Sequence, residues 1–152
     1  MCIRDSTLPL KSLDIYISGC IGNPHCEGCH NPESWDFNQG EEYTLDYFKS
    51  NIDKKVKEFD NLIDNIMIFG GEPLDSDIFE VEVFLQDLKE LSKNIWLFTH
   101  YDLDEIPIFI QEKCDYIKTG RYLPKLKKDN YIQYGITLAT SNQKIHKKGV
   151  DY

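Results

Sequence analysis

Short β-rich runs alternate with stretches of helical periodicity along this chain, and this alternation is the feature that most limits its fold. Apolar residues recur every three or four positions over 45–59, behind Thr44 as a helix N-cap, and again over 78–91. A short helix is predicted near 106–112, and strands are predicted at 13–18, 65–69, 95–99, 115–118 and 131–138. Strand–helix alternation is typical of βαβ units. The sequence therefore predicts the α/β class, with a mostly parallel sheet of about five strands.

The length of 152 residues and the absence of a Pro/Gly/Ser-rich linker predict a single domain over 13–152. The opening letters MCIRDS resemble a translated adapter fragment, so we expect 1–12 to be a non-native or truncated segment. A net charge of −9 disfavours nucleic acid and anionic membranes as partners, and no apolar run is long enough to span a bilayer. Five cysteines without a secretion signal indicate a reducing, cytoplasmic compartment.

A loop over 20–40, rich in Gly, Pro, Asn and His, follows the first predicted strand and shows no sustained period. Long loops in compact domains are usually functional. This one contains Cys20, Cys26 and Cys29, separated by five and then two residues. Thiolates are soft ligands that suit zinc or iron–sulfur clusters. A structural zinc site needs four ligands, and His25 or His30 would have to supply the fourth. Three thiolates on a cubane would instead leave one iron open to a small molecule.

A second motif, Gly70-Gly71-Glu72-Pro73, follows the second predicted strand directly. Two glycines at a strand end let the backbone approach a ligand closely, and Glu72 offers a carboxylate to a cationic group. The alternative reading is a tight turn into the next helix. In a parallel sheet the carboxyl ends of the strands share one edge, where ligands bind. Cys20, Gly70, Thr99 and Gly120 should therefore lie together.

These motifs in this order resemble the radical S-adenosylmethionine superfamily, and specifically the branch of glycyl-radical activases that act on anaerobic ribonucleotide reductase. The resemblance covers about 13–143 and includes the segment Gly-Cys-His-Asn-Pro-Glu-Ser-Trp, Thr99-His100-Tyr101, 115–122 and 141–143. That superfamily usually spaces its cysteines by three and then two residues, so this chain has two more between the first pair. The position before the third cysteine is Gly28, as is common in the activase branch.

The resemblance implies an open partial (β/α) barrel that carries a [4Fe-4S] cluster on Cys20, Cys26 and Cys29. It implies S-adenosyl-L-methionine as second cofactor, bound by Gly70–Pro73 with His30, Asn31 and Thr99, and no catalytic residue beyond the cluster and cofactor. Reductive cleavage would give a 5′-deoxyadenosyl radical that makes a glycyl radical on the large subunit of anaerobic ribonucleoside-triphosphate reductase. The electron donor would be of the flavodoxin or ferredoxin type.

Two other functions remain open on the sequence. One is a small radical enzyme with another peptide or a small molecule as substrate. The other is a non-enzymatic zinc-binding module, which would hold one zinc ion and no iron. Cys114 stands apart from the loop, and we expect it to be a buried thiol at the start of a strand.

Overall fold

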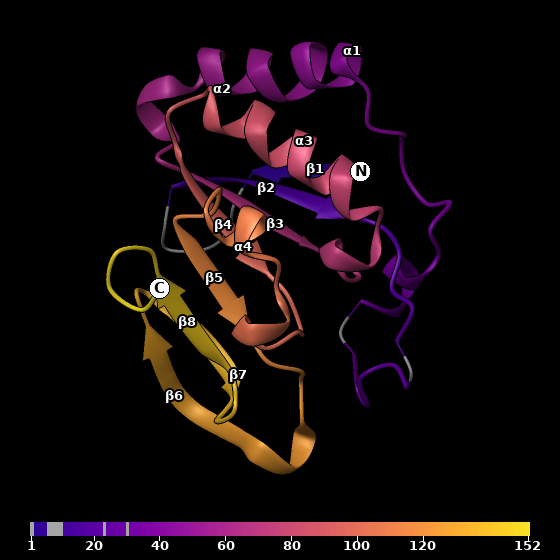
Figure 1. Cartoon of the computed structure of the whole chain (residues 1–152), viewed down its shortest axis with the longest axis vertical. Helices are drawn as coiled ribbons and strands as arrows, with labels where there is room; N and C mark the ends of the chain where they lie inside the picture. Colours follow the sequence, from indigo (N-terminus) through magenta and orange to yellow (C-terminus); the bar gives the residue numbers. More distant parts are fainter. Residues whose placement is uncertain (1, 6–10, 23, 30) are drawn as a thin grey trace.

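The fold is known from a computed structural model that describes residues 2–5, 11–22, 24–29 and 31–152. It is α/β, with a six-stranded sheet in the order β1-β2-β3-β4-β5-β8 and a separate two-stranded sheet, β6-β7 (Figure 1). The strands are β1 Cys2–Asp5, β2 Ser12–Ile17, β3 Asn65–Gly70, β4 Asn94–Phe98, β5 Tyr116–Thr119, β6 Lys127–Gln133, β7 Ile136–Thr140 and β8 Lys144–Lys147. The helices are α1 Leu45–Tyr47, a π-helical segment η2 Phe48–Asp53, α2 Lys54–Glu58, α3 Ile78–Lys89 and α4 Ile108–Gln111. Short 3-10 turns are η1 Pro32–Trp35, η3 Asp60–Leu62, η4 Pro73–Asp75, η5 Leu103–Glu105 and η6 Pro124–Leu126.

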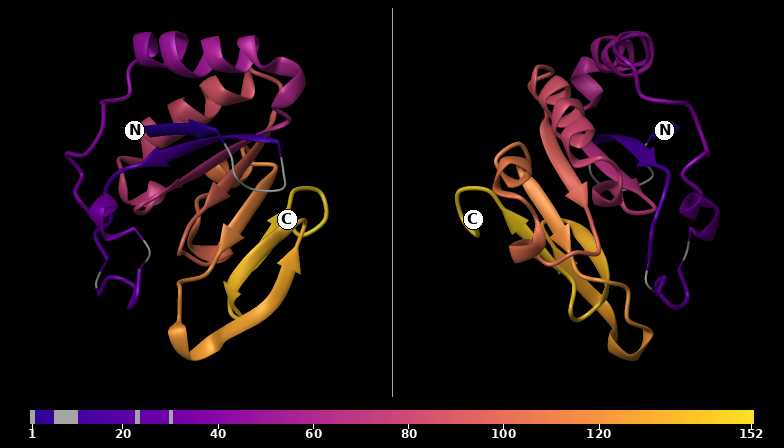
Figure 2. Two further views of the ribbon diagram at one scale, coloured as in Figure 1. Left: turned by 180° about the vertical axis from the view of Figure 1, so that it is seen from behind. Right: turned by 45° about the vertical axis from the view of Figure 1, so that its right-hand side comes forward.

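Strands β2, β3, β4 and β5 are parallel to one another, and β1 and β8 pair antiparallel at the two edges. Side chains alternate between the faces of the sheet. On β3, Ile66 and Ile68 join the core under the helices, whereas Met67 joins Trp96 and Leu138 in a second core under the β6-β7 hairpin. The helices and the hairpin therefore cover opposite faces, and Figure 2 shows α1 and the hairpin at opposite ends of the molecule.

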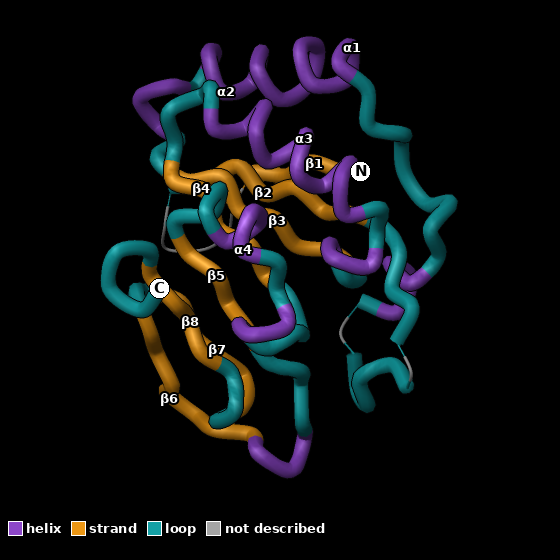
Figure 3. Tube along the Cα trace, in the orientation of Figure 1, coloured by secondary structure: helices purple, strands orange, loops and turns teal. Residues whose placement is uncertain are grey.

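The two predicted amphipathic helices are confirmed. From α1 to α2 the chain is helical throughout, and Phe48, Ile52 and Val56 bury one face at a spacing of four residues (Figure 3). Thr44 is the N-cap, since its side chain accepts a hydrogen bond from the Tyr47 N–H at 3.1 Å. Helix α3 begins behind Asp77, whose carboxylate accepts hydrogen bonds from two backbone N–H groups of the first turn.

The prediction of one strand over 131–138 is wrong. Tyr134 and Gly135 adopt φ angles of +48° and +80°, so the run is divided by a tight turn into β6 and β7. The polar segment after Ser141, for which no strand was predicted, contains β8. Its Ile145 is buried between the sheet and the hairpin. The main sheet thus has six strands rather than about five, of which four are parallel.

Two further expectations can be compared with the fold. Cys114 is fully buried just before β5, as predicted, and its carbonyl accepts a hydrogen bond from the Tyr152 hydroxyl at 2.6 Å. Among the residues that the structure describes, no helix combines the length and apolar character that a bilayer-spanning segment requires.

Candidate functional site

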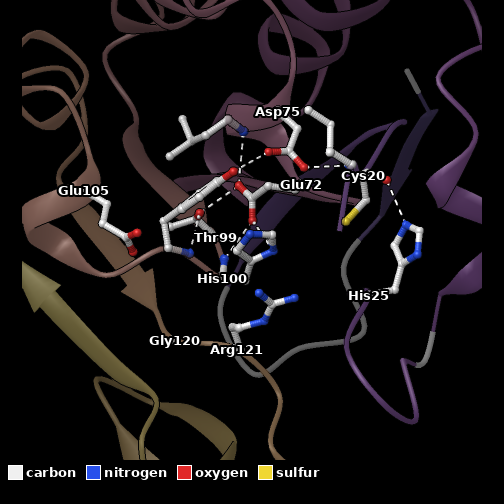
Figure 4. Close-up of polar contacts among 12 residues, drawn as sticks. Cys20, His25, Glu72, Asp75, Thr99, His100, Glu105, Gly120 and Arg121 are labelled. Carbon is white, nitrogen blue, oxygen red and sulfur yellow. Dashed lines mark hydrogen bonds and ion pairs between the residues drawn. The ribbon is translucent and has the colours of Figure 1, made fainter. Parts of the chain in front are cut away.

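The carboxyl ends of β2, β3, β4 and β5 meet at one edge of the sheet. Ile17 pairs with Gly70, and Phe98 pairs with Lys118, so the strands end at nearly the same level. Past the strand ends, the Thr99 N–H still donates to the Lys118 carbonyl at 2.9 Å. The predicted meeting of the cysteine loop with the residues after β3, β4 and β5 is confirmed (Figure 4).

The double glycine after β3 is required by the backbone of the cysteine loop. The Gly71 N–H donates to the Ile17 carbonyl at 3.0 Å, and the Glu72 N–H donates to the Gly19 carbonyl at 2.7 Å. A Cβ atom at Gly70 would lie 1.9 Å from the Ile17 carbonyl oxygen, and one at Gly71 would lie 2.4 Å from that of Gly19. The start of the cysteine loop and the Gly70–Pro73 turn are therefore joined directly by backbone hydrogen bonds.

Glu72 is 1% exposed, and its carboxylate is surrounded by protein donors. Oε1 accepts from the Thr99 hydroxyl at 2.7 Å and the Leu74 N–H at 3.1 Å, and Oε2 accepts from the His100 N–H at 2.7 Å. Burial raises the pKa of Glu72 to about 7, against the opposing effect of these hydrogen bonds. The side chain thus links the end of β3 to the end of β4.

The His100 ring also reaches this carboxylate, with Nδ1 at 3.2 Å from Oε2. The distance alone would suggest an ion pair. Burial, however, lowers the pKa of His100, which disfavours the charged form of the ring. We therefore describe the contact as a hydrogen bond of a neutral ring within the same network.

Asp75 makes a second link, which the sequence analysis did not identify. Its Oδ1 accepts from the Tyr101 hydroxyl at 2.5 Å, and its Oδ2 accepts from the Ile21 N–H at 2.8 Å. The first of these bonds, together with burial, raises the pKa of the Tyr101 hydroxyl. Contacts to residues 26 and 54 positions away leave no local signal in the sequence.

The three cysteines of the loop are partly buried and free of disulfides. The Cys20 N–H donates to the Trp35 carbonyl at 3.1 Å, and a turn joins Cys29 N–H to the Cys26 carbonyl at 3.2 Å. Burial raises the pKa of the Cys20 thiol to about 11, and the charges of Asp75, Glu72 and the other two cysteines add to this. The Cys20 thiolate therefore needs a cationic group beside it, as an iron–sulfur cluster would provide.

A zinc site with His25 as fourth ligand has little support in this geometry. The described residues contain no group of three or more His, Cys, Asp or Glu side chains placed to hold one metal ion, and this includes the three cysteines of the loop. His25 Nε2 lies 2.9 Å from the Cys20 carbonyl, and its ring stacks on Trp35 at 3.9 Å, so it forms part of the loop's own packing. His30 lies outside the described residues. Its neighbour Asn31 is half-buried, and its carbonyl accepts hydrogen bonds from Ser34.

Two cationic side chains face the cysteine loop from the end of β5. Lys118 Nζ donates to the Gly120 carbonyl at 3.0 Å. Burial lowers the pKa of Lys118 to about 8, although the charges of Glu72 and Cys26 oppose the shift. The Arg121 guanidinium donates to the Pro24 carbonyl within the loop. Segment 115–122 is part of the family resemblance, but no role for Lys118 or Arg121 was predictable from the sequence.

Comparison with known proteins shows the family to which the chain belongs. Residues 11–146 match the family model described as a 4Fe-4S single cluster domain. The chain belongs to the 4Fe-4S single cluster domain family. It is 27% identical over 141 residues to the anaerobic ribonucleoside-triphosphate reductase-activating protein of Escherichia coli K12, covering 87% of this chain and 85% of that protein. Proteins of the same name from Salmonella typhimurium and phage T4 are 28% and 27% identical, covering 87% and 71% of this chain and 85% and 69% of theirs. No solved structure matches the chain significantly.

The match to the 4Fe-4S domain family includes every part of the site. Residues 11–146 contain the three cysteines, Gly70–Pro73 and Thr99, together with the network around Glu72 and Asp75. Membership supports an iron–sulfur cluster rather than zinc as the metal group. The three free cysteines of one loop, the carboxylates near Cys20 and the nearby cations Lys118 and Arg121 fit such a cofactor.

Proposed function

We propose that this chain is a radical S-adenosylmethionine enzyme that installs a glycyl radical on the large subunit of anaerobic ribonucleoside-triphosphate reductase. The observation that carries the proposal is the direct hydrogen bonding between the three-cysteine loop and the Gly70–Pro73 turn at one sheet edge. The 4Fe-4S family match and the names of the relatives support it. The open sheet, with β1 and β8 at its edges, would be the partial barrel of that superfamily.

In this proposal Cys20, Cys26 and Cys29 hold the cluster and leave one of its irons for S-adenosylmethionine. When bound, the cluster supplies one electron for the cleavage that gives methionine and the 5′-deoxyadenosyl radical, which takes a hydrogen atom from a glycine of the reductase. The protein's part is to bind, orient and exclude water, since the cofactors carry the difficult chemistry. The electron would come from a flavodoxin- or ferredoxin-type donor.

The role of Glu72 can be stated more closely. A carboxylate has about four lone-pair positions, and three protein donors and the His100 ring already surround this one. We therefore propose that Glu72 and Thr99 fix the shape of the Gly70–Pro73 turn, and that backbone groups of the turn meet the amino group of S-adenosylmethionine. His30 and Asn31, beside Cys29, remain candidate cofactor contacts.

The test of the metal centre is analysis of iron and sulfide in anaerobically purified protein. We expect about four irons per chain, and we expect Cys29→Ala to lose most of them together with the brown colour. Cys114→Ala is the matched control, because it removes a buried thiol far from the loop and should keep the iron. One tightly bound zinc in place of iron would contradict the proposal.

The test of the reaction is formation of 5′-deoxyadenosine from S-adenosylmethionine under reducing conditions, followed by electron paramagnetic resonance after addition of the reductase. A glycyl-radical signal is expected only with reductase, cofactor and reductant together. Cofactor cleavage without that signal would favour a different peptide or small-molecule substrate. Absence of cleavage by a fully loaded cluster would refute the radical mechanism.

A further inference from the structure

A groove of about 1210 Å³ lies between the loop before α1 and the first turns of α3. Residues 37–45 form one wall, and residues between 75 and 87 form the other. Figure 3 shows the loop running past the start of α3. We call this feature the α3 groove. It lies beside the helical layer and shares Asp75 with the functional site.

Four large apolar side chains of the α3 groove are exposed. Phe37 is 49% exposed, Leu45 57%, Phe79 68% and Val83 58%. Single exposed apolar residues are common on protein surfaces and need no explanation. Four that line one groove form an apolar surface of the kind that marks an interaction site.

The charge of the α3 groove has one sign. Six carboxylates line it, and its lining, taken over the residues that the structure describes, contains no Lys, Arg or His. Across the whole chain the ratio is 26 acidic to 17 basic residues, so the groove is far more one-sided than the protein. Asp75 and Asp77 are engaged in hydrogen bonds within the protein, whereas Glu42 and Glu80 are exposed at the rim. An occupant that is both apolar and basic would complement this surface.

The α3 groove continues into the cysteine loop. Ile17 and Ser18, which precede Cys20 closely, belong to its lining, and the Ser18 hydroxyl donates to the Gln39 carbonyl at 2.6 Å. Asp75, also in the lining, holds the Ile21 N–H on the other side of Cys20. A segment bound in the groove would therefore reach the edge of the proposed cluster site.

We infer that the α3 groove docks a polypeptide segment that combines Lys or Arg with apolar side chains, on the protein that receives the radical. This inference rests on the proposed function. A second copy of this chain fits less well, although β6 carries Lys127, Lys128 and the exposed Ile132. Placing β6 of one copy in the groove of another would be a head-to-tail contact, which grows into filaments unless it closes into a ring.

The binding test uses a short fluorescein-labelled peptide of alternating Lys and Leu, and a counterpart with Glu in place of Lys, measured by anisotropy at physiological salt. The Lys peptide should bind and the Glu peptide should not. The double variant Glu42→Lys/Glu80→Lys should weaken binding roughly tenfold, as expected for the reversal of two rim charges. Its control, Glu58→Lys/Glu90→Lys, changes net charge equally at exposed positions outside the groove and should bind like the wild type.

A second pair of variants tests the apolar part. Val83→Ser should weaken binding of the Lys peptide several-fold, whereas Ile132→Ser, at a similarly exposed residue on β6, should not. If the groove and control variants weaken binding of the Lys peptide equally, the peptide responds only to the overall negative charge of the protein, and the inference is overturned. No binding of the Lys peptide would overturn it too. So would a sedimentation result in which the groove variants dissociate a self-assembled form, because the occupant would then be a second copy.

The functional test separates this inference from the proposed function. Glu42→Lys/Glu80→Lys should raise the reductase concentration that gives half-maximal glycyl radical, and should leave cleavage of S-adenosylmethionine without reductase unchanged. If the wild type does not cleave the cofactor, the proposed function fails. If it cleaves the cofactor and forms the glycyl radical, but the groove variants show the same dependence on reductase concentration, only the docking inference fails.

Discussion

Replacing Glu72 with Gln measures how far burial controls the charge of the site. In the folded protein the pKa of Glu72 is raised from 4.5 to about 7, chiefly by burial. The folded state therefore holds a proton that the unfolded chain loses near pH 4.5. Stability from this proton is fully present below pH 4.5 and is lost as the pH rises through 7. At 1.36 kcal/mol per pKa unit, the change amounts to about 3 kcal/mol.

The amide of Glu72→Gln has no such proton, so the variant should gain about 3 kcal/mol relative to wild type between pH 4.5 and 7.5. The amide also changes the free energy of unfolding by an amount that does not depend on pH, because its NH₂ group meets donors that previously faced a carboxylate oxygen. That offset cancels when the difference between variant and wild type is followed across pH. The assay is anaerobic urea unfolding of the cluster-free protein by circular dichroism, at several pH values in this range.

Glu58→Gln, at an exposed carboxylate outside the site, controls for amide substitution and loss of charge. A difference between Glu72→Gln and wild type that stays constant from pH 4.5 to 7.5 would refute the reasoning. It would mean that the hydrogen bonds from Thr99 and the His100 backbone outweigh burial and keep the carboxylate ionised.

Two other substitutions test the links between the strand ends. Gly71→Ala would place a methyl group 2.4 Å from the Gly19 carbonyl oxygen, so it should displace the cysteine loop and lower iron content. Gly149→Ala meets no atom within 4 Å and should cost only the strain of its φ of +79°, about 1–2 kcal/mol in thermal or urea unfolding, with iron unchanged. Asp75→Asn should lower the pKa of the Tyr101 hydroxyl toward its ordinary value, because a charged acceptor is lost. Ultraviolet titration of the tyrosines would show this, with the Tyr101→Phe variant identifying the contribution of Tyr101. An unchanged titration in Asp75→Asn would contradict the role of Asp75.

The parallel strands and the edge at which their ends meet were predictable from the sequence. Each buried run stops at a residue that breaks the strand or begins a loop, such as Gly70 at the end of β3. Parallel pairing then places all the carboxyl ends together, whatever the details of the loops. This is why Cys20 and Thr99, far apart in the chain, could be expected at one edge.

The C-terminal part was predicted less well because its signals are short. Tyr134-Gly135 is a two-residue turn without the usual Asn or Asp, and the flanking residues continue the β pattern across it. Strand β8 has only four residues, and of these only Ile145 is both apolar and buried. Its place in the sheet depends on pairing with β5, 25 or more residues earlier, which no local pattern reveals.

The position of Glu72 at the sheet edge was predictable from the sequence, whereas its contacts were not. Glu72 was read as a carboxylate aimed at a ligand, and in the structure its oxygens bond to Thr99 and the His100 backbone, 27 and 28 residues further on. Such contacts depend on how the loops pack. Only the finished fold shows that the conspicuous carboxylate holds two strand ends together.

The same reasoning applies to the five-residue gap between Cys20 and Cys26, which is two residues longer than the usual spacing of the superfamily that the loop resembles. His25, directly before Cys26, turns back so that its ring meets the Cys20 carbonyl at 2.9 Å and stacks on Trp35. The Trp35 carbonyl in turn accepts a hydrogen bond from the Cys20 N–H, so both ends of the gap are fixed to one residue of η1. Cys20 and His25, the residue before Cys26, therefore lie against the same turn, so the longer gap folds back onto η1.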